Sequence, residues 1–75
     1  MKPPTLEQLN QQCENWNSVN AVGAAVTVEM DNGEIRHTKT RSEAQVLSGH
    51  TAVIWLEGIS GAYLLSRVRP EPVNV

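Results

Sequence analysis

Residues 51–70 read TAVIWLEGISGAYLLSRVRP, and this stretch decides the fold. It contains two apolar runs, residues 52–56 and 62–65, on either side of the corner Gly-Ile-Ser-Gly at 58–61. Two short apolar runs around a glycine-containing corner are typical of a β-hairpin. The basic segment that follows, residues 66–69, predicts a tight turn into a short last strand. The rest of the chain must then cover this hairpin.

The two faces of the hairpin follow from parity, because successive side chains of a strand point to opposite sides. One face is predicted to be the core face and carries Ala52, Ile54, Leu56, Tyr63 and Leu65. The other face is also apolar and carries Val53, Trp55, Ala62 and Leu64. A hairpin with two apolar faces is either covered on both sides or leaves one face open as a binding surface.

The N-terminal part predicts one helix, over about residues 5–16. Thr5 and Gln8 have the spacing of a capping box, in which the two side chains satisfy two backbone N–H groups at the start of a helix. A narrow apolar stripe follows at helical spacing, formed by Leu6, Leu9, Cys13 and Trp16. A helix of about three turns is marginal alone in water, so this stripe must dock, and the hairpin is its candidate partner.

Residues 24–30 alternate between apolar and polar positions, which predicts a half-buried strand. The turn Asp-Asn-Gly-Glu at 31–34 follows, and Asn-Gly favours a two-residue type I′ loop. That loop sets Met30 opposite Ile35 and Glu29 opposite Arg36. A three-residue loop would set Glu29 opposite Ile35, so the pairing pattern favours the type I′ register.

In that register His37 and Lys39 fall on the inner face, so the second strand leaves the core there or bends over an open barrel edge. Residues 42–47 have the composition of a helical turn, with Ser42 and Gln45 again at capping-box spacing. They are expected to form one helical turn or an irregular crossing. Residues 48–50 are expected to form a loop.

One helix and four to five short strands predict an α+β domain that is mainly β: a small SH3-like barrel, or a strongly curled antiparallel sheet. The chain is expected to be a single domain over 1–75, with the barrel over about 22–70 and a flexible tail over 71–75. The end of the chain resembles SH3-like barrels, with Gly61-x-Tyr63, a tight turn at 65–67 and a final strand at Val68.

Residues 16–70 also resemble small proteins without assigned activity that bacteriophages and prophages carry. The shared features are Val22-Gly23, Asp31-Asn32-Gly33, Gly49-His50-Thr51 and the run from Val53 to Gly58. This resemblance implies an origin in a phage or prophage, and therefore the cytoplasm of a bacterial host. It implies no activity.

The composition limits the classes of function. The formal net charge is −2, whereas general nucleic-acid binders are usually basic. The single cysteine, Cys13, fits a reducing compartment. No signal peptide is recognisable, and the longest apolar run is far too short to span a membrane. We therefore expect a cytoplasmic protein that is not attached to a membrane.

Few residues could carry chemistry. The two histidines, His37 and His50, and the single Cys13 lack the spacing of a catalytic or zinc constellation. Residues 58–61 could cradle a phosphate through their amides, but the geometry of a hairpin corner accounts for both glycines. We therefore expect no enzyme activity, no cofactor and no metal.

Two binding functions remain. The leading hypothesis is an interaction or adaptor protein that binds a protein partner, or a second copy of itself, through the second apolar face. The alternative is a binder of nucleic acid or of an anionic nucleotide through a basic patch, formed by Arg36, Lys39, Arg41, Arg67 and Arg69. Glutamates lie among these basic residues in the sequence, so a solvated surface of mixed charge is the simpler interpretation of the patch.

Overall fold

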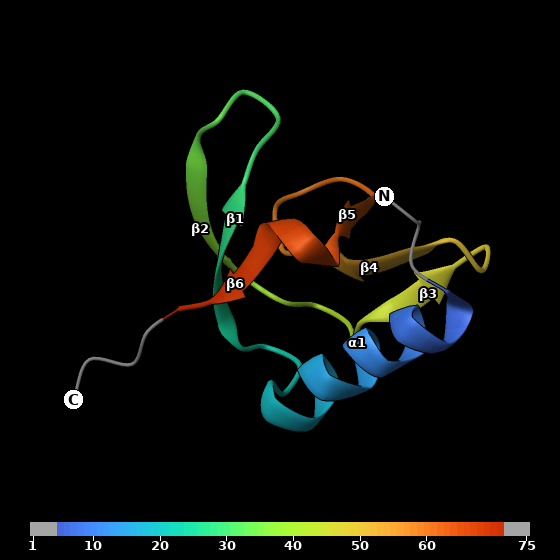
Figure 1. Ribbon diagram of the computed structural model, residues 1–75. Helices are drawn as coiled ribbons and strands as arrows, with labels where there is room; N and C mark the ends of the chain where they lie inside the picture. Colours follow the sequence, from blue (N-terminus) through green and yellow to red (C-terminus); the bar gives the residue numbers. More distant parts are fainter. Residues whose placement is uncertain (1–4, 72–75) are drawn as a thin grey trace.

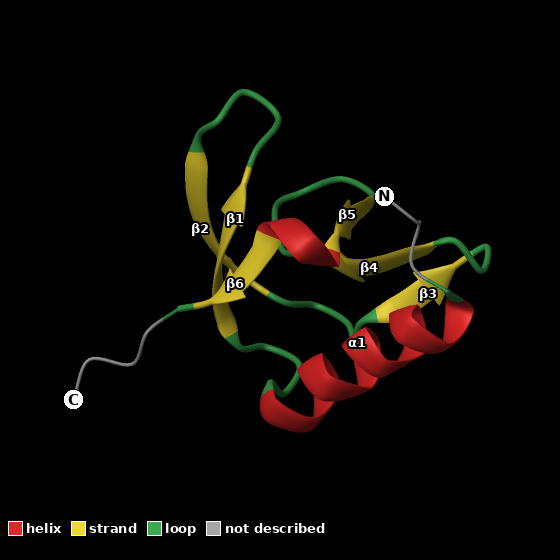
Figure 2. Cartoon of the chain, in the orientation of Figure 1, coloured by secondary structure: helices red, strands yellow, loops and turns green. Residues whose placement is uncertain are grey.

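The computed structural model describes residues 5–71 of the chain (Figure 1). Within them the elements are α1 (Leu6–Val19), β1 (Ala25–Glu29), β2 (Ile35–Lys39), β3 (Gln45–Leu47), β4 (Thr51–Trp55), β5 (Ala62–Leu64), the 3₁₀ turn η1 (Leu65–Arg67) and β6 (Val68–Pro70). The expected α+β class is confirmed. Figure 2 shows the helix lying along one side of the strands.

The strands form two antiparallel three-stranded sheets, in the orders β2-β1-β6 and β3-β4-β5. The expectation of one curled sheet of four to five strands, or of an SH3-like barrel, is therefore wrong. The sheets meet at a single bridge between Thr40 and Leu56, flanked by the bonds from Arg41 N–H to the Trp55 carbonyl and from Glu57 N–H to the Lys39 carbonyl. So short a contact joins the sheets without closing them into a barrel.

Helix α1 begins as the capping box predicts. The Thr5 hydroxyl accepts from the Gln8 N–H at 3.2 Å, and the Gln8 side chain accepts from the Thr5 N–H at 2.9 Å. The helix continues three residues beyond the predicted end at Trp16. Asn20 caps the last turn of this longer helix, because its backbone N–H and its side-chain amide both donate to the Trp16 carbonyl.

The register of the β1–β2 hairpin differs from the prediction by one residue, and Glu29 lies opposite Ile35. The loop has three residues, with bonds from Gly33 N–H to the Met30 carbonyl and from Met30 N–H to the Glu34 carbonyl. Gly33 has a φ of 85°, whereas Asn32 keeps a negative φ. A type I turn followed by a glycine bulge makes this pattern, and it needs a positive φ at one position only.

The three-residue loop also suits the burial of β2. It places His37 and Lys39 opposite Thr27 and Ala25, on the outer face of the sheet, instead of beside the buried valines of β1. The same register places the Ile35 side chain on the outer face as well, where it is 54% exposed. Keeping the charge of Lys39 and the imidazole of His37 in water outweighs the exposure of one isoleucine, because burying an unpaired charge is far more costly.

The loop geometry predicts a difference between two alanine variants. Gly33→Ala is expected to lower the free energy of unfolding by about 1 kcal/mol, because alanine is strained at a positive φ. Asn32→Ala is expected to lower it by only about 0.5 kcal/mol, because it removes the exposed hydrogen bond from the Glu34 N–H to Asn32 Oδ1 but introduces no strain. Urea unfolding followed by circular dichroism measures both. Equal losses would indicate the type I′ loop, in which both positions need a positive φ.

Residues 45–47 form strand β3, so the expectation of a helical turn at 42–47 is wrong. Val46 lies opposite Ala52, and the reversal at 48–50, expected as a loop, returns the chain into β4. Both Ser48 and Gly49 have positive φ, at 54° and 73°, which folds the chain back sharply. Pairing with β4 gives residues 45–47 a ladder of backbone bonds that outweighs their local helix propensity.

The core lies between α1 and the inner faces of the two sheets. Its buried members are Leu9, Cys13, Val26, Val28, Ala44, Ala52, Ile54, Leu56, Leu65 and Val68. Trp16 and Tyr63 are partly buried against them. The predicted core face of the hairpin is therefore confirmed, and it is the face that the helix stripe covers.

Candidate functional site

The first candidate surface is the outer face of the β3-β4-β5 sheet, on the side away from α1. We call it the Trp55 face and define it by Val53, Trp55, Ala62 and Leu64. The register confirms that these side chains share a face, because Val53 lies opposite Leu64 and Trp55 lies opposite Ala62. The Trp55 face and the core cluster have no member in common.

The Trp55 face is apolar and free of charge. Leu64 is 42% exposed, and Leu47, which lies on the same side of the neighbouring strand, is 49% exposed. Trp55 and Ala62 are half-buried, while Val53, at the centre of the sheet, is buried between its neighbours. None of the residues of β3, β4 and β5 carries a charged side chain. Charged residues are depleted in the same way at the centres of protein interfaces.

The size of the Trp55 face suits a protein surface. Three strands about 4.8 Å apart, with about 3.3 Å per residue, give a face of about 15 Å on each side. A sheet face of this kind offers no enclosure for a small molecule. It can instead pack against another flat surface, as the faces of stacked sheets do.

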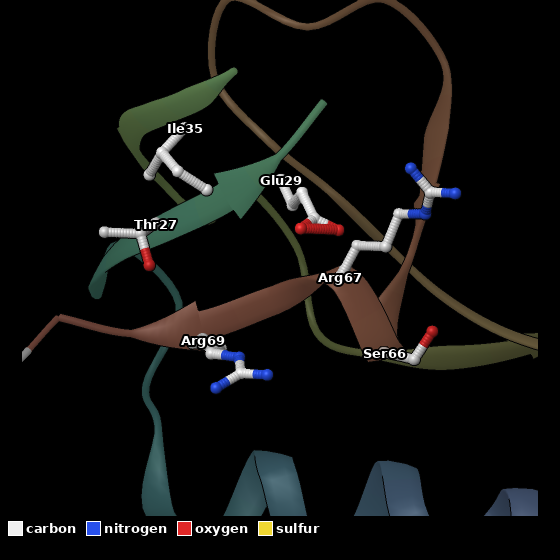
Figure 3. Close-up of a pocket in the computed structure, with 6 residues that line it drawn as sticks. All are labelled: Thr27, Glu29, Ile35, Ser66, Arg67 and Arg69. Atoms are coloured by element: carbon white, nitrogen blue, oxygen red, sulfur yellow. The ribbon is translucent and has the colours of Figure 1, made fainter. Parts of the chain in front are cut away.

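The second candidate surface is a cleft of about 230 Å³ on the outer face of the β2-β1-β6 sheet (Figure 3). We call it the arginine cleft. Its lining comes from three strands and η1 and comprises Thr27, Glu29, Ile35, Ser66, Arg67 and Arg69. Thr27 and Glu29 project from the central strand β1, Ile35 from β2, and the arginines from η1 and β6. Figure 3 shows the guanidinium groups of Arg67 and Arg69 pointing apart.

The charges of the arginine cleft are only partly paired. Arg67 Nη1 lies 3.1 Å from Asp31 Oδ1, at the tip of the β1–β2 hairpin. Within residues 5–71, the ion pairs are this one and the contact of His37 Nδ1 with Glu71 Oε1. Glu29 and Arg69 belong to neither pair. Among these residues the cleft therefore holds one free carboxylate and one free guanidinium, and it is not a two-arginine clamp for a single anion.

The five residues of the predicted basic patch do not converge. Arg67 and Arg69 line the arginine cleft, and Lys39 lies on the same face of the sheet, two strands away. Arg36 lies opposite Val28 and borders a different cleft, with Met30 and Tyr63. Arg41 follows β2, where the two sheets meet. The one-residue difference in register places Arg36 on the opposite face of the sheet from Arg67 and Arg69. Arg36 and Lys39 lie on opposite faces of β2 in either register, because they are three residues apart.

The residues considered for catalysis are spread over the molecule. Cys13 is buried in the helix stripe, and desolvation raises the pKa of its thiol, so it packs as a small hydrophobe. His50 is exposed beside a shallow cleft whose lining also includes Leu9 of α1 and Leu64 of the Trp55 face. Gly58 and Gly61 have positive φ, as a hairpin corner requires. Among the residues that the structure describes, no three potential metal ligands lie together.

The arginine cleft could not be found as a unit from the sequence, because the cleft depends on register. Glu29 and Arg67 are neighbours only because β6 pairs with β1, with Val28 opposite Val68. The three-residue loop places Ile35 opposite Glu29, although the pattern of cross-strand pairs in the sequence favoured the two-residue loop. Pairing of the last strand with the first has no local sequence signal.

The described part of the chain contains no helix that is long and apolar enough to cross a membrane. The resemblance to bacteriophage and prophage proteins carries no residue role, so it adds nothing to either candidate surface. Comparison of the chain with protein-family models, with curated proteins and with solved structures gave no match, so the resemblance stays a prediction and both surfaces rest on geometry.

Proposed function

We propose that the chain is a non-enzymatic interaction protein that binds another protein molecule through the Trp55 face. The observation that carries this proposal is the position of α1. The helix packs on the side of Ala52 and Ile54, and within residues 5–71 the core cluster includes no residue of the opposite, uncharged side of the same hairpin, where Leu64 alone borders a cleft beside α1. Aromatic side chains on uncharged surfaces are typical anchors of protein interfaces.

A second copy of the chain is the partner that this surface fits first. In a two-fold symmetric contact the same patch meets itself, so any charge at its centre would face a like charge. The strands beneath the Trp55 face carry no charge and avoid this repulsion. Small chains such as this one often depend on association for stability.

The expected affinity is low. A face of about 15 Å on each side buries about 450 Å² over two copies, well below the roughly 1,600 Å² of a standard interface. At about 25 cal/mol per Å² this gives about 11 kcal/mol, which the cost of association, about 4–15 kcal/mol, largely offsets. We therefore expect weak association, in the micromolar to millimolar range.

Substitution of the Trp55 face should abolish association and leave the fold intact. Wild-type protein is expected to shift from monomer to dimer in sedimentation as its concentration rises from micromolar to millimolar. Leu64→Lys and Trp55→Ser are expected to remain monomeric throughout, since each removes apolar contact and Leu64→Lys also adds a like charge to both copies. Far-ultraviolet circular dichroism checks the fold.

Ile35→Ser is the matched control, because it removes an exposed apolar side chain from the outer face of the other sheet. It should associate like the wild type. If the wild type stays monomeric over the whole range, self-association is excluded. If Ile35→Ser abolishes association and Leu64→Lys does not, the contact lies on the other sheet.

Two observations weigh against the alternative function, the binding of nucleic acid or of an anionic nucleotide. Arg36 lies apart from the other basic residues, so the patch is divided. The arginine cleft, at about 230 Å³, is smaller than the roughly 300–1,000 Å³ typical of small-molecule sites, and a nucleotide needs such a volume. A phage or prophage origin and a cytoplasmic location stay part of the proposal, supported by the resemblance and by the single cysteine.

A further inference from the structure

We infer that the arginine cleft is a separate binding site for a small zwitterion, a molecule with an ammonium and a carboxylate a few bonds apart, such as a free α-amino acid. The inference does not depend on the Trp55 face, which belongs to the other sheet. It rests on the unpaired charges of the cleft, on the positions of the two charged residues in the sheet and on the volume of the cleft.

The charges come first. Glu29 follows Val28 and Arg67 precedes Val68 at the last pair of the β1–β6 ladder, so Glu29 and Arg67 are neighbours across the two strands. Arg67 nevertheless forms its ion pair with Asp31. Arg69 lies opposite Thr27, one step further along β6. Opposite charges on Glu29 and Arg69 therefore line one cleft without meeting each other or, among residues 5–71, any other charged partner. A ligand that carries both signs of charge satisfies both residues.

The positions of the two residues suit a short zwitterion. Glu29 and Arg69 are diagonal neighbours on adjacent strands, and the backbones of such neighbours are about 7–8 Å apart, within reach of long side chains. Side chains as long as those of glutamate and arginine can each make one hydrogen bond of about 2.9 Å to a small molecule bound between them. Its ammonium donates to the Glu29 carboxylate, and the guanidinium of Arg69 donates to its carboxylate, the geometry that arginine favours.

The volume and the remaining walls define the rest of the ligand. A cleft of about 230 Å³ has the volume of about eight water molecules at roughly 30 Å³ each, which suits a molecule of amino-acid size. Thr27 and Ser66 add hydroxyl groups, and Ile35 offers an apolar wall that is 54% exposed. An amino acid with an aliphatic side chain, such as leucine, fills the cleft and contacts Ile35.

Titration of ¹⁵N-labelled protein with leucine at low salt tests the inference by NMR. The amide signals of Thr27, Glu29 and Arg69 are expected to shift and to saturate with a millimolar midpoint. N-acetylleucine lacks the ammonium and leucinamide lacks the carboxylate, so each should bind at least about tenfold more weakly, a loss of about 1.4 kcal/mol. High salt should weaken the binding of leucine, because the cleft is open to solvent.

Four variants locate the bound leucine. Glu29→Gln and Arg69→Gln should each abolish saturable shifts, because each removes one of the two charges that the ligand bridges. Arg36→Gln, on the other face of the sheet, should bind leucine like the wild type. Trp55→Ser should also bind normally, so failure of the proposed protein interaction leaves this result untouched.

Three results would overturn the inference. The first is the absence of saturable shifts up to the solubility limit of leucine. The second is equal binding of N-acetylleucine and leucine, which would indicate a contact with the apolar wall alone. The third is normal binding by Arg69→Gln, which would place the ligand elsewhere.

Discussion

Ile54→Ala is expected to be among the most destabilising single substitutions in this chain, lowering the free energy of unfolding by about 2–5 kcal/mol. Ile54 is fully buried at the centre of β4 and belongs to the cluster that joins α1 to both sheets. The whole stability of a 75-residue chain is expected to be about 4–11 kcal/mol, so this loss removes a large share of it. Urea unfolding followed by tryptophan fluorescence measures the loss.

Leu64→Ala is the comparison, since Leu64 lies on the other face of the same hairpin and is 42% exposed. We expect it to lower the free energy of unfolding by less than about 1 kcal/mol, because little apolar surface leaves the core. The melting temperatures should separate clearly, since 1 kcal/mol corresponds to about 4–8 °C in a domain of this size. A larger loss for Leu64→Ala than for Ile54→Ala would mean that the helix covers the Trp55 face after all.

Asn17→Ala is the second large expected effect, at about 2–3 kcal/mol, because each buried polar group left without its partner costs about 1–3 kcal/mol. The Asn17 side chain accepts from the Ala44 N–H at 2.9 Å and donates to the Ala44 carbonyl at 3.1 Å. Ala44 is 5% exposed, so alanine at position 17 leaves a buried donor and a buried acceptor unbonded. The same pair of bonds holds the helix to the segment between the two sheets. Urea unfolding measures this loss as well.

Asn15→Ala is the matched control for this prediction, because Asn15 lies on the same helix and is exposed. Both variants gain the higher helix propensity of alanine, and Asn15→Ala removes only the exposed hydrogen bond from Gln11 Nε2 to Asn15 Oδ1, so their difference is due mainly to the buried bonds to Ala44. Asn15→Ala is expected to change the free energy of unfolding by less than about 0.5 kcal/mol. Similar values for the two variants would show that the Asn17–Ala44 contact contributes little in solution.

The parts of the fold that the sequence predicted correctly depend on residues close together in the chain. The capping box at Thr5 and Gln8 needs one helical turn, and the alternation of Val26 and Val28 needs one strand. The parity of the β4–β5 hairpin needs one corner, at residues 58–61. Local geometry dictates such features, so composition and spacing suffice to find them.

The incorrect predictions concern competition between alternatives that are similar in local energy. Asn32-Gly33 allows either a two-residue or a three-residue loop, and the three-residue loop keeps Lys39 on the exposed outer face. Residues 45–47 have helix-forming composition, and pairing with β4 made them a strand. In both cases contacts made elsewhere in the chain outweighed the local preference.

The sequence by itself determined the helix, the two hairpins and the existence of two apolar faces on β4 and β5. Only the tertiary structure decided which face α1 covers, how β6 pairs with β1 and which charges share the arginine cleft. Both faces of the hairpin are apolar in sequence, so the choice between them depends on packing with Leu9, Cys13 and the valines of β1. Those contacts join distant parts of the chain, and the periodicity of a single strand carries no information about them.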